Sequence, residues 1–349
     1  WLEEAIWPAE ARHASTAFVR DGSLLAAAEM LRGGITTCND LYFYPEATAE
    51  AFDRLGLRAV LGITVIEFPS QYASDADDYL HKGLATFDAW RDHPLIRFAL
   101  APHAPYTVAD KTLERVASLA DELELPIHIH IHETLSEIND SLRDFGQRPI
   151  SRLDQLGLLG PNLIGVHAVH LDDGDIERLA LHNCAIAHCP TSNMKLASGA
   201  APAARLLDRG LNVGLGTDGA ASNNRLDLFR EMQQASLLAK LTTGDAATLP
   251  AHRALRMATL DGARALGLDH HIGSIAPGKA ADLCAVRVSD PDALPCFQPV
   301  SHLVHVLGRH DVSDVWVAGK PRVQGGRLLQ ITNTELLSTA RLWQNRLRQ

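Results

Sequence analysis

The stretch 126–133, PIHIHIHE, carries three histidines and a carboxylate close together. His128, His130 and His132 alternate with isoleucines, so a strand would place all three imidazoles on one face and the isoleucines on the other. Glu133 follows directly. These residue types predict a metal site or a proton-transfer site, and the alternative is a buried strand whose polar residues meet solvent at one end.

Polar residues also follow other apolar segments that read as strands. The candidates are His103 after IRFALAP, His167 and His170 in LIGVHAVH, His188 in AIAHCP and Asp218 after NVGLGT. Each has a structural alternative: a turn cap for His103, a core histidine for His167 and a turn-forming role for Asp218. In a (β/α)8 barrel, however, the carboxyl ends of the strands meet at one mouth, so we expect these side chains to converge there.

A convergent set of histidines with one aspartate suits Zn²⁺ or a similar cation, which binds imidazole nitrogen and carboxylate oxygen. Such an ion lowers the pKa of a bound water to ~7. A neighbouring carboxylate such as Glu133 could then move protons between that water and a substrate. The pattern therefore predicts hydrolytic chemistry.

The elements that would position these residues alternate regularly along the chain. Helices are predicted at 1–10, 18–31, 47–55, 76–90, 109–123, 135–145, 149–156, 173–181, 200–209 and 227–241, and strands at 35–41, 58–65, 96–103, 126–132, 163–170, 185–190 and 212–218. This alternation predicts an α/β fold, a (β/α)8 TIM barrel whose first strand would lie before Trp1. The GxGxxG spacing occurs in GLGTDG, which overlaps the last predicted strand rather than following one, and no GxxxxGK[ST] motif occurs, which argues against dinucleotide and P-loop sites.

The sequence pattern changes near Gly267, after which short apolar segments are separated by Gly and Pro. We expect residues 1–266 to form the barrel, with its strands two to eight. Residues 267–349 would form the C-terminal part of a small β-sandwich module plus a terminal helix, with short strands at 274–288, 304–307 and 315–320.

Composition narrows the class of partner. The net charge of −10 and pI near 5.9 argue against nucleic acid and favour a small-molecule ligand. No apolar run is long enough for a membrane span, and residues 1–20 show no n-region followed by an apolar h-region, so we expect neither a membrane span nor export. Five scattered cysteines fit free thiols in a reducing compartment, so we expect a cytoplasmic protein. The sequence does not decide between a monomer and a homo-oligomer.

The segments HIHIHE, GVHAVH and GLGTDGAASNN resemble the amidohydrolase superfamily. More narrowly, they are similar to the 5′-methylthioadenosine/S-adenosylhomocysteine deaminases and the related triazine hydrolases. The similarity continues through WLEEAIWPAE, EMLRGGITTCND, APHAPYTV, HCPTSNMKLASG and SIAPGKAADL. It implies a barrel enzyme with one divalent metal ion, Zn or else Fe or Mn.

The resemblance also implies roles for individual residues. It implies that His130 and Asp218 bind the metal, that Asp218 takes a proton from the water, that Glu133 protonates the purine ring and that His167 orients the hydroxide. It further implies substrate contacts, from His103 and Ser222 to the purine and from Glu10 to the ribose hydroxyls. His188 and Asn193 are weaker candidates, and His128 and His132 gain no role.

The family has a His-x-His pair at the end of its first strand, and this chain has none at that place. We therefore expect the chain to lack the N-terminal segment of the family and to supply two of four protein ligands. The leading hypothesis is hydrolytic deamination of S-adenosylhomocysteine, 5′-methylthioadenosine or adenosine to the inosine analogue and ammonia. The alternatives are an amidohydrolase acting on guanine, a pterin or a chlorotriazine, and a truncated non-catalytic barrel that binds a nucleoside.

Overall fold

The computed structural model describes residues 2–348, which divide into two units. Unit 1 contains residues 1–99, 281–287 and 310–349, and unit 2 contains residues 100–280 and 288–309. Each unit is described by itself. Trp1, which the sequence places in a helix, lies outside the described residues.

Unit 1 begins with helices and continues with parallel strands. Its elements are η1 (Leu2–Ile6), α1 (Trp7–His13), α2 (Thr16–Arg32), β1 (Thr37–Asp40), α3 (Pro45–Leu55), β2 (Arg58–Val65), α4 (Ala76–Trp90) and the first part of β3 (Ile96–Pro102). β1 pairs in parallel with β2. All but the first residue of β2 are buried, as expected for a strand covered on both faces.

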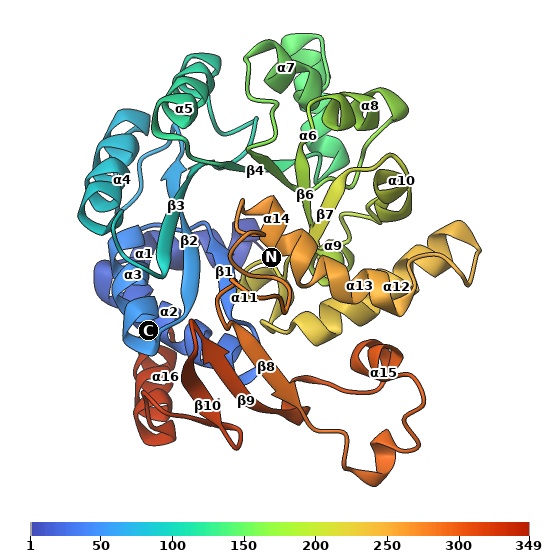
Figure 1. The fold of residues 1–349 in the computed structure, drawn as a ribbon. Coiled ribbons are helices and arrows are strands. Elements are labelled where there is room, and N and C mark those ends of the chain that lie inside the picture. The colour runs from blue at the N-terminus through green and yellow to red at the C-terminus, as the bar shows by residue number, and fades with distance from the viewer. Residues whose placement is uncertain (1, 349) are drawn as a thin grey trace. The chain divides into compact units, whose positions relative to one another are not determined.

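An antiparallel sheet completes unit 1. Its strands are β8 (Leu283–Val286), β9 (Val312–Val317), β10 (Lys320–Gln324) and β11 (Arg327–Leu328), in the order β11-β10-β9-β8. Figure 1 shows β8, β9 and β10 side by side, with α16 (Asn333–Leu347) near β10. The Trp343 ring of α16 meets Phe18 edge-on at 5.0 Å, and its indole N–H donates to Asp21 at 2.8 Å. The terminal helix is therefore anchored on α2.

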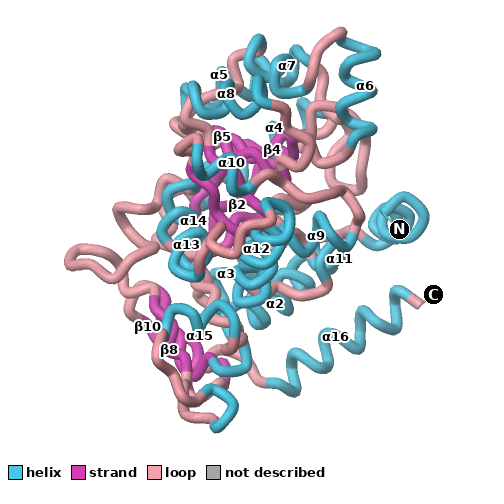
Figure 2. Tube along the Cα trace, turned by 90° about the vertical axis from the view of Figure 1, so that its right-hand side faces the viewer, coloured by secondary structure: helices cyan, strands magenta, loops and turns pink. Residues whose placement is uncertain are grey.

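Unit 2 carries the remaining parallel strands, β4 (Ile127–Ile131), β5 (Leu163–His167), β6 (Ala185–His188) and β7 (Asn212–Leu215). Figure 2 shows β4 and β5 with helices such as α5 and α8 beside them. The helices of this unit are α5 (Asp110–Leu123), α6 (Leu135–Phe145), α7 (Pro149–Gln155), α8 (Asp173–Leu181), α9 (Pro190–Lys195), α10 (Ala203–Asp208), α11 (Ala220–Asn223), α12 (Leu228–Thr243), α13 (Ala251–Met257), α14 (Leu260–Ala265), η2 (Pro291–Ala293) and α15 (Pro299–His305). Unit 2 ends at Arg309, which is the first residue of η3 (Arg309–Asp311).

Local capping explains where several helices start. Thr134, Asp172 and Asp227 each accept a backbone N–H from the first turn of α6, α8 and α12. At α8 the contact is a complete capping box with Asp175. Such caps satisfy N–H groups that have no partner within the helix. They therefore set where each helix begins after its βα loop.

The predicted alternation of strands and helices is confirmed. The seven parallel strands form one sheet in sequence order, β1 to β7, and β2, α4, α6 and α8 have the predicted bounds. The strand expected before Trp1, the closure of a barrel and the boundary near residue 267 stay predictions. None of the helices in residues 2–348 is long and apolar enough to cross a membrane.

The C-terminal module differs from the prediction at one of its expected strands. Residues 304–307 were expected to be a strand, but they cover the end of α15 and the turn after it. Pro299 occupies the first turn of that helix, where its fixed φ favours helix initiation, and this outweighs the strand preference of the β-branched Val304. Within the described residues the module is a single antiparallel sheet, so a second sandwich layer stays a prediction.

Candidate active site

Five candidate side chains come from the carboxyl ends of the strands of unit 2. His130 and His167 lie at the ends of β4 and β5, while His103, Glu133 and Asp218 follow β3, β4 and β7. Neighbouring parallel strands end at the same edge of their sheet, so short loops bring these residues together. The rings of His130 and His167 are stacked, and Nε2 of His167 faces the carboxylates of Glu133 and Asp218.

The His130 ring is held in one tautomer. Its backbone N–H and its Nδ1 both lie within hydrogen-bonding distance of the His103 carbonyl oxygen, at 3.1 and 2.6 Å. A carbonyl only accepts, so Nδ1 must carry the proton and Nε2 keeps its lone pair. Burial, with a further contribution from His167, holds the pKa of His130 below its usual value. The ring is thus neutral and Nε2 is suited to bind a cation.

The His167 ring is oriented by an amide. It stacks on His130 with ring centroids 5.4 Å apart, and its Nδ1 donates to Oδ1 of Asn193 at 2.9 Å. Its Nε2 lies 3.8 Å from a carboxylate oxygen of Glu133 and 4.0 Å from one of Asp218. Both distances are too long for a direct hydrogen bond. Nε2 therefore faces two carboxylates and is satisfied by neither.

The Asp218 carboxylate is firmly held. The Ser192 hydroxyl donates to its Oδ2 at 2.6 Å, and the Gly219 N–H donates to its Oδ1 at 2.5 Å. The backbone of Asp218 lies in the left-handed region, with φ 61°, which turns the chain sharply after β7. Asp218 is thereby aimed toward His130 and His167 rather than outward as in a plain turn.

The Glu133 carboxylate is held more loosely than its own backbone. Its Oε1 accepts only a long bond, 3.5 Å, from the Ser198 hydroxyl. Its backbone N–H donates to Glu137 at 2.8 Å, and the N–H of His132 donates to the other Glu137 oxygen at 2.9 Å. A fixed backbone with a carboxylate that makes only a long hydrogen bond suits a residue that carries a proton between two partners.

Glu137 was missed by sequence reasoning. It is buried, and burial raises its pKa to about 7 although the N–H groups of His132 and Glu133 act in the opposite direction. A signal was available, because Thr134 and Glu137 form the Thr-x-x-Glu pattern of a capping box at the start of α6. Its carboxylate accepts the backbone N–H groups of His132 and Glu133 in the β4–α6 loop.

Ser192 was also missed, and Asn193 was only a weak candidate. Both lie in α9 and hold Asp218 and His167 respectively. The segment HCPTSN follows β6, and its polar residues after an apolar strand were the available signal. Because each partner lies 26 residues away, only the folded chain shows the pairing.

The other unit 2 candidates border this cluster. His188 at the end of β6 is buried with no hydrogen-bond partner for its Nδ1 in residues 2–348, and burial, then His167, lowers its pKa to about 4. The His103 ring lies 4.9 Å from that of His130, and burial, then the two neighbouring histidines, lowers its pKa to about 3. Ser222 is buried in α11. Purine contacts by His103 and Ser222 stay predictions.

Glu10 belongs to α1 of unit 1. The Tyr42 hydroxyl donates to its Oε1 at 2.7 Å. Burial raises the pKa of Glu10, and the hydrogen bond from Tyr42 partly offsets this. One carboxylate oxygen of Glu10 is thus engaged within its own unit, and its predicted ribose contact stays a prediction.

The expectation that three imidazoles of the 126–133 stretch share one face is wrong for His132. β4 ends at Ile131, and His132 takes a left-handed backbone conformation, with φ 50°. Its ring is fully buried, where Nδ1 lies 3.2 Å from the His170 carbonyl and Nε2 accepts the Ile150 N–H at 3.1 Å. The His128 ring stays near that of His130, at 6.2 Å.

The donors at the strand ends fit a borderline divalent cation. His130 offers an imidazole nitrogen and Asp218 a carboxylate oxygen, which are the ligand types that Zn²⁺ takes in hydrolases. The unpartnered Nδ1 of His188 adds a further nitrogen at the neighbouring strand. Within residues 2–348 no three His, Cys, Asp or Glu side chains are arranged as a complete ligand set, so His130 and Asp218 need additional donors.

Comparison with known proteins identifies one matching family and several similar deaminases. Residues 1–322 match the amidohydrolase family. A 5-methylthioadenosine/S-adenosylhomocysteine deaminase of Teredinibacter turnerae is 48% identical over 347 residues, which are 99% of this chain and 78% of that protein. A 5′-deoxyadenosine deaminase of Methanothermobacter thermautotrophicus is 43% identical over 328 residues, which are 94% of this chain and 76% of that protein.

A solved structure agrees with these relatives. The crystal structure of an adenosine deaminase from Xanthomonas campestris with bound zinc superimposes with a TM-score of 0.98 at 47% identity. The similarity covers 100% of this chain and 79% of that one. By its family match, its relatives and its fold, the protein belongs to the amidohydrolase family.

Proposed function

We propose that the protein is a metal-dependent hydrolase that deaminates adenine nucleosides to inosine analogues and ammonia. The observation that carries the proposal is the position of His167, whose Nε2 faces the carboxylates of Glu133 and Asp218 at 3.8 and 4.0 Å beside a neutral His130. Membership of the amidohydrolase family and the deaminase names of the relatives support it.

His130 and Asp218 are the residues that would hold the metal, for which we propose zinc. When bound, the ion would supply hydroxide at neutral pH, because it lowers the pKa of its water to ~7. The zinc in the similar adenosine deaminase structure supports this choice over iron or manganese.

The two carboxylates divide the proton transfers. Asp218 accepts the proton of the attacking water on the carboxylate that Ser192 and Gly219 hold in place. Glu133 delivers a proton to a ring nitrogen of the purine, which makes C6 more electrophilic. The water oxygen bonds to C6, and the proton held by Asp218 passes to the amino nitrogen, which leaves as ammonia when its bond to C6 breaks. The remaining water proton leaves the C6 oxygen as the carbonyl forms and passes to Glu133, which restores the proton that it gave to the ring.

His167 positions the attacking oxygen. Since Asn193 engages its Nδ1–H, the neutral ring presents Nε2 as a hydrogen-bond acceptor. A water held between this nitrogen and the Asp218 carboxylate would be aligned for attack and deprotonation at once.

The proposed substrates are 5′-methylthioadenosine, S-adenosylhomocysteine, 5′-deoxyadenosine and adenosine. Glu10 would bind the ribose hydroxyls through the oxygen that Tyr42 leaves free, while His103 and Ser222 would contact the purine. The cytoplasmic location expected from the cysteines stays a proposal.

The direct test is turnover by the complete, zinc-loaded protein. Each nucleoside is incubated with enzyme, the ultraviolet change from adenine to hypoxanthine is followed, and released ammonia is counted. We expect turnover of at least one of the four. Absence of turnover for all four, with one zinc per chain bound, would contradict the proposal and favour a non-catalytic nucleoside-binding barrel.

A second experiment separates nucleosides from free bases. In Glu10→Gln a charged hydrogen bond to the ribose is replaced by a neutral one, so KM for a nucleoside should rise by about tenfold or more. Glu4→Gln, at an exposed position nearby, is the matched control. An unchanged KM in Glu10→Gln would instead support guanine, a pterin or a chlorotriazine as the substrate.

A further inference from the structure

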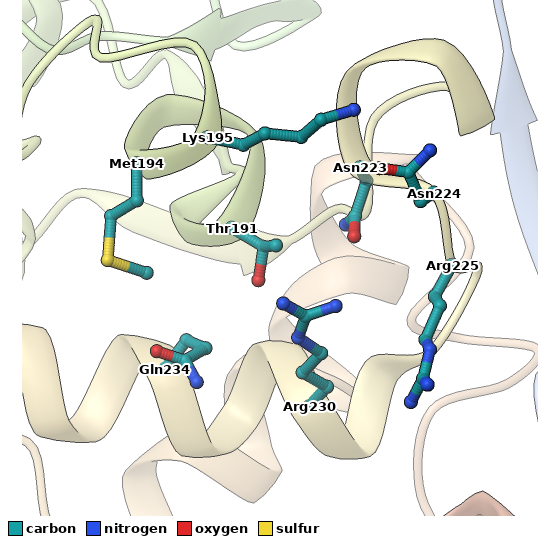
Figure 3. A pocket seen from close by; sticks show the side chains of 8 residues that line it. All are labelled: Thr191, Met194, Lys195, Asn223, Asn224, Arg225, Arg230 and Gln234. Atoms are coloured by element: carbon teal, nitrogen blue, oxygen red, sulfur yellow. The ribbon is translucent and has the colours of Figure 1, made fainter.

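A polar hollow of about 510 Å³ lies in unit 2 between α9, the segment after α11 and α12. It is lined mainly by polar and basic side chains, namely Thr191, Lys195, Asn223, Arg225, Arg230 and Gln234 (Figure 3). None of its lining residues is acidic. The deaminase chemistry uses none of these side chains, so the hollow needs an explanation of its own.

Two of its arginines have no carboxylate in close contact within residues 2–348. Other arginines of unit 2 are paired, such as Arg148 with Asp175, Arg178 with Asp154, Arg209 with Glu177 and Arg256 with Asp261. Arg225 and Arg230 take part in none of the close ion pairs of residues 2–348, and the charge of Arg230 acts on the buried Glu231 only from a longer distance. In Figure 3 the Arg230 guanidinium points into the hollow. Guanidinium groups that have no carboxylate in close contact favour an oxyanion at the hollow that they line.

Two buried polar atoms at the same hollow also lack partners. Thr191 is 4% exposed and Asn223 is 2% exposed, yet Oγ1 of Thr191 and Oδ1 of Asn223 have no hydrogen-bond partner in the described chain. Figure 3 shows the Thr191 hydroxyl directed toward Arg230. Buried polar atoms are rarely left unpaired unless a ligand or water completes them.

The neighbouring buried carboxylate, Glu231, interacts with the same residues: burial raises its pKa, and the Asn223 and Thr191 side chains and the charge of Arg230 act in the opposite direction. Glu231 accepts the Thr191 N–H at 3.1 Å and the Asn223 amide at 2.8 Å. The same Asn223 amide nitrogen also donates to the Thr217 carbonyl at 2.7 Å. These bonds fix Asn223 so that its amide nitrogen is engaged, and its Oδ1 is left as an acceptor.

We propose that this hollow binds a phosphate group that retains a hydroxyl. Arg225, Arg230 and the Thr191 hydroxyl would donate to the phosphate oxygens, while the P–OH group would donate to Oδ1 of Asn223. Hydrogenphosphate supplies both kinds of atom, which a fully ionised oxyanion such as sulfate does not. The site is independent of the proposed deaminase activity and adds a second ligand to the protein.

The test is calorimetric titration of inorganic phosphate into the complete zinc-loaded protein at low salt and neutral pH. The wild type should bind one phosphate per chain at the hollow. Arg230→Gln and Arg225→Gln should each weaken binding by about tenfold or more, and Thr191→Val by about threefold to tenfold. Arg209→Gln, which alters an exposed arginine paired with Glu177, should leave the affinity unchanged.

Two further titrations distinguish ligands of similar charge. Sulfate should bind at least several-fold more weakly than phosphate, because it cannot donate to Asn223. Glycerol phosphate should compete with phosphate if the natural source is a phosphate monoester, and fail to compete if it is free phosphate. Equal binding of sulfate and phosphate would overturn the role of Asn223.

An affinity that stays unchanged in both Arg225→Gln and Arg230→Gln would place phosphate elsewhere, including at the strand ends, and overturn the proposal. Absence of saturable binding would do the same. Retained nucleoside turnover in both variants would show that they are folded. Since turnover and phosphate binding are measured separately, failure of one proposal leaves the other to be judged on its own.

Discussion

Two clusters of histidine and carboxylate meet at the end of β4 and differ in how their polar atoms are satisfied. In the His132 cluster, made of His132, Arg148 and Asp175, both ring nitrogens have partners and Asp175 accepts from Arg148 at 2.8 Å. In the strand-end cluster, made of His130, Glu133, His167 and Asp218, no hydrogen bond within residues 2–348 reaches Nε2 of either histidine.

The contrast shows that residue type and burial do not distinguish a structural cluster from a functional one. His132 and His167 are both almost completely buried and both lie near carboxylates. A network with every atom satisfied stabilises one conformation, whereas unsatisfied lone pairs beside loosely held carboxylates leave capacity for a metal, water or substrate. Glu137 joins the two clusters, since its oxygens accept the backbone N–H groups of His132 and Glu133.

The largest effect is expected at the strand-end cluster, from Glu133→Gln. The amide cannot deliver a proton, so kcat for nucleoside deamination should fall by about 10² to 10⁴. Zinc content and thermal stability should stay as in the wild type, because the Glu133 carboxylate makes only one long hydrogen bond. Glu122→Gln, at an exposed position of α5, is the control. A Glu133→Gln enzyme with wild-type turnover would remove its proton-transfer role.

At the His132 cluster the opposite result is expected from Asp175→Ala. Removing this 3% exposed carboxylate breaks the close ion pair with Arg148, which keeps only Asp172, and also breaks the capping box of α8, so the free energy of unfolding should fall by about 3 kcal/mol. Urea titration measures the loss. Glu177→Ala, on the same helix with an exposed partner, should cost at most ~1 kcal/mol. A large drop in kcat per folded Asp175→Ala molecule would show that the His132 cluster also supports catalysis, which would contradict its purely structural role.

The link between the clusters should show in the pH dependence of stability. The pKa of Glu137 is about 7 in the folded protein, while it is near 4.5 in an unfolded chain. At a pH between these two values, the folded protein holds the Glu137 proton and the unfolded chain releases it. The contribution of Glu137 to the free energy of unfolding is therefore complete below pH 4.5 and is lost as the pH rises to 7. The loss is roughly 3 kcal/mol. Glu137→Gln should flatten this part of the curve of unfolding free energy against pH, and an identical slope in both proteins would contradict it.

The smallest effect is expected from Asn193→Ala, which removes the partner of His167 Nδ1. The freed ring should lower kcat by about tenfold to 100-fold with KM little changed, because positioning rather than binding is lost. Asn193→Asp retains an acceptor and should recover much of the rate. If Asn193→Asp is as slow as Asn193→Ala, the hydrogen bond to His167 does not set the rate.

Sequence patterns predicted the alternating architecture well because the relevant interactions are local. Apolar segments of period two, helix caps such as Asp75 and Thr134, and terminal glycines such as Gly146 act within a few residues. The error at 304–307 has the same origin: a short apolar run carries no period that distinguishes strand from helix, and Pro299 decided the outcome from the preceding turn.

Local sequence was thus enough to establish the order of strands and helices, the residues that follow each strand and the likeness to amidohydrolases. Only the folded chain decided which histidine nitrogens are free. His132 and His130 stand two residues apart in a repeating pattern. Both ring nitrogens of His132 are hydrogen-bonded, to Ile150 and His170, whereas His130 is hydrogen-bonded through Nδ1 and its Nε2 has no partner within residues 2–348. The reason is physical: hydrogen-bond partners come from segments distant in sequence, and a repeating pattern contains no record of them.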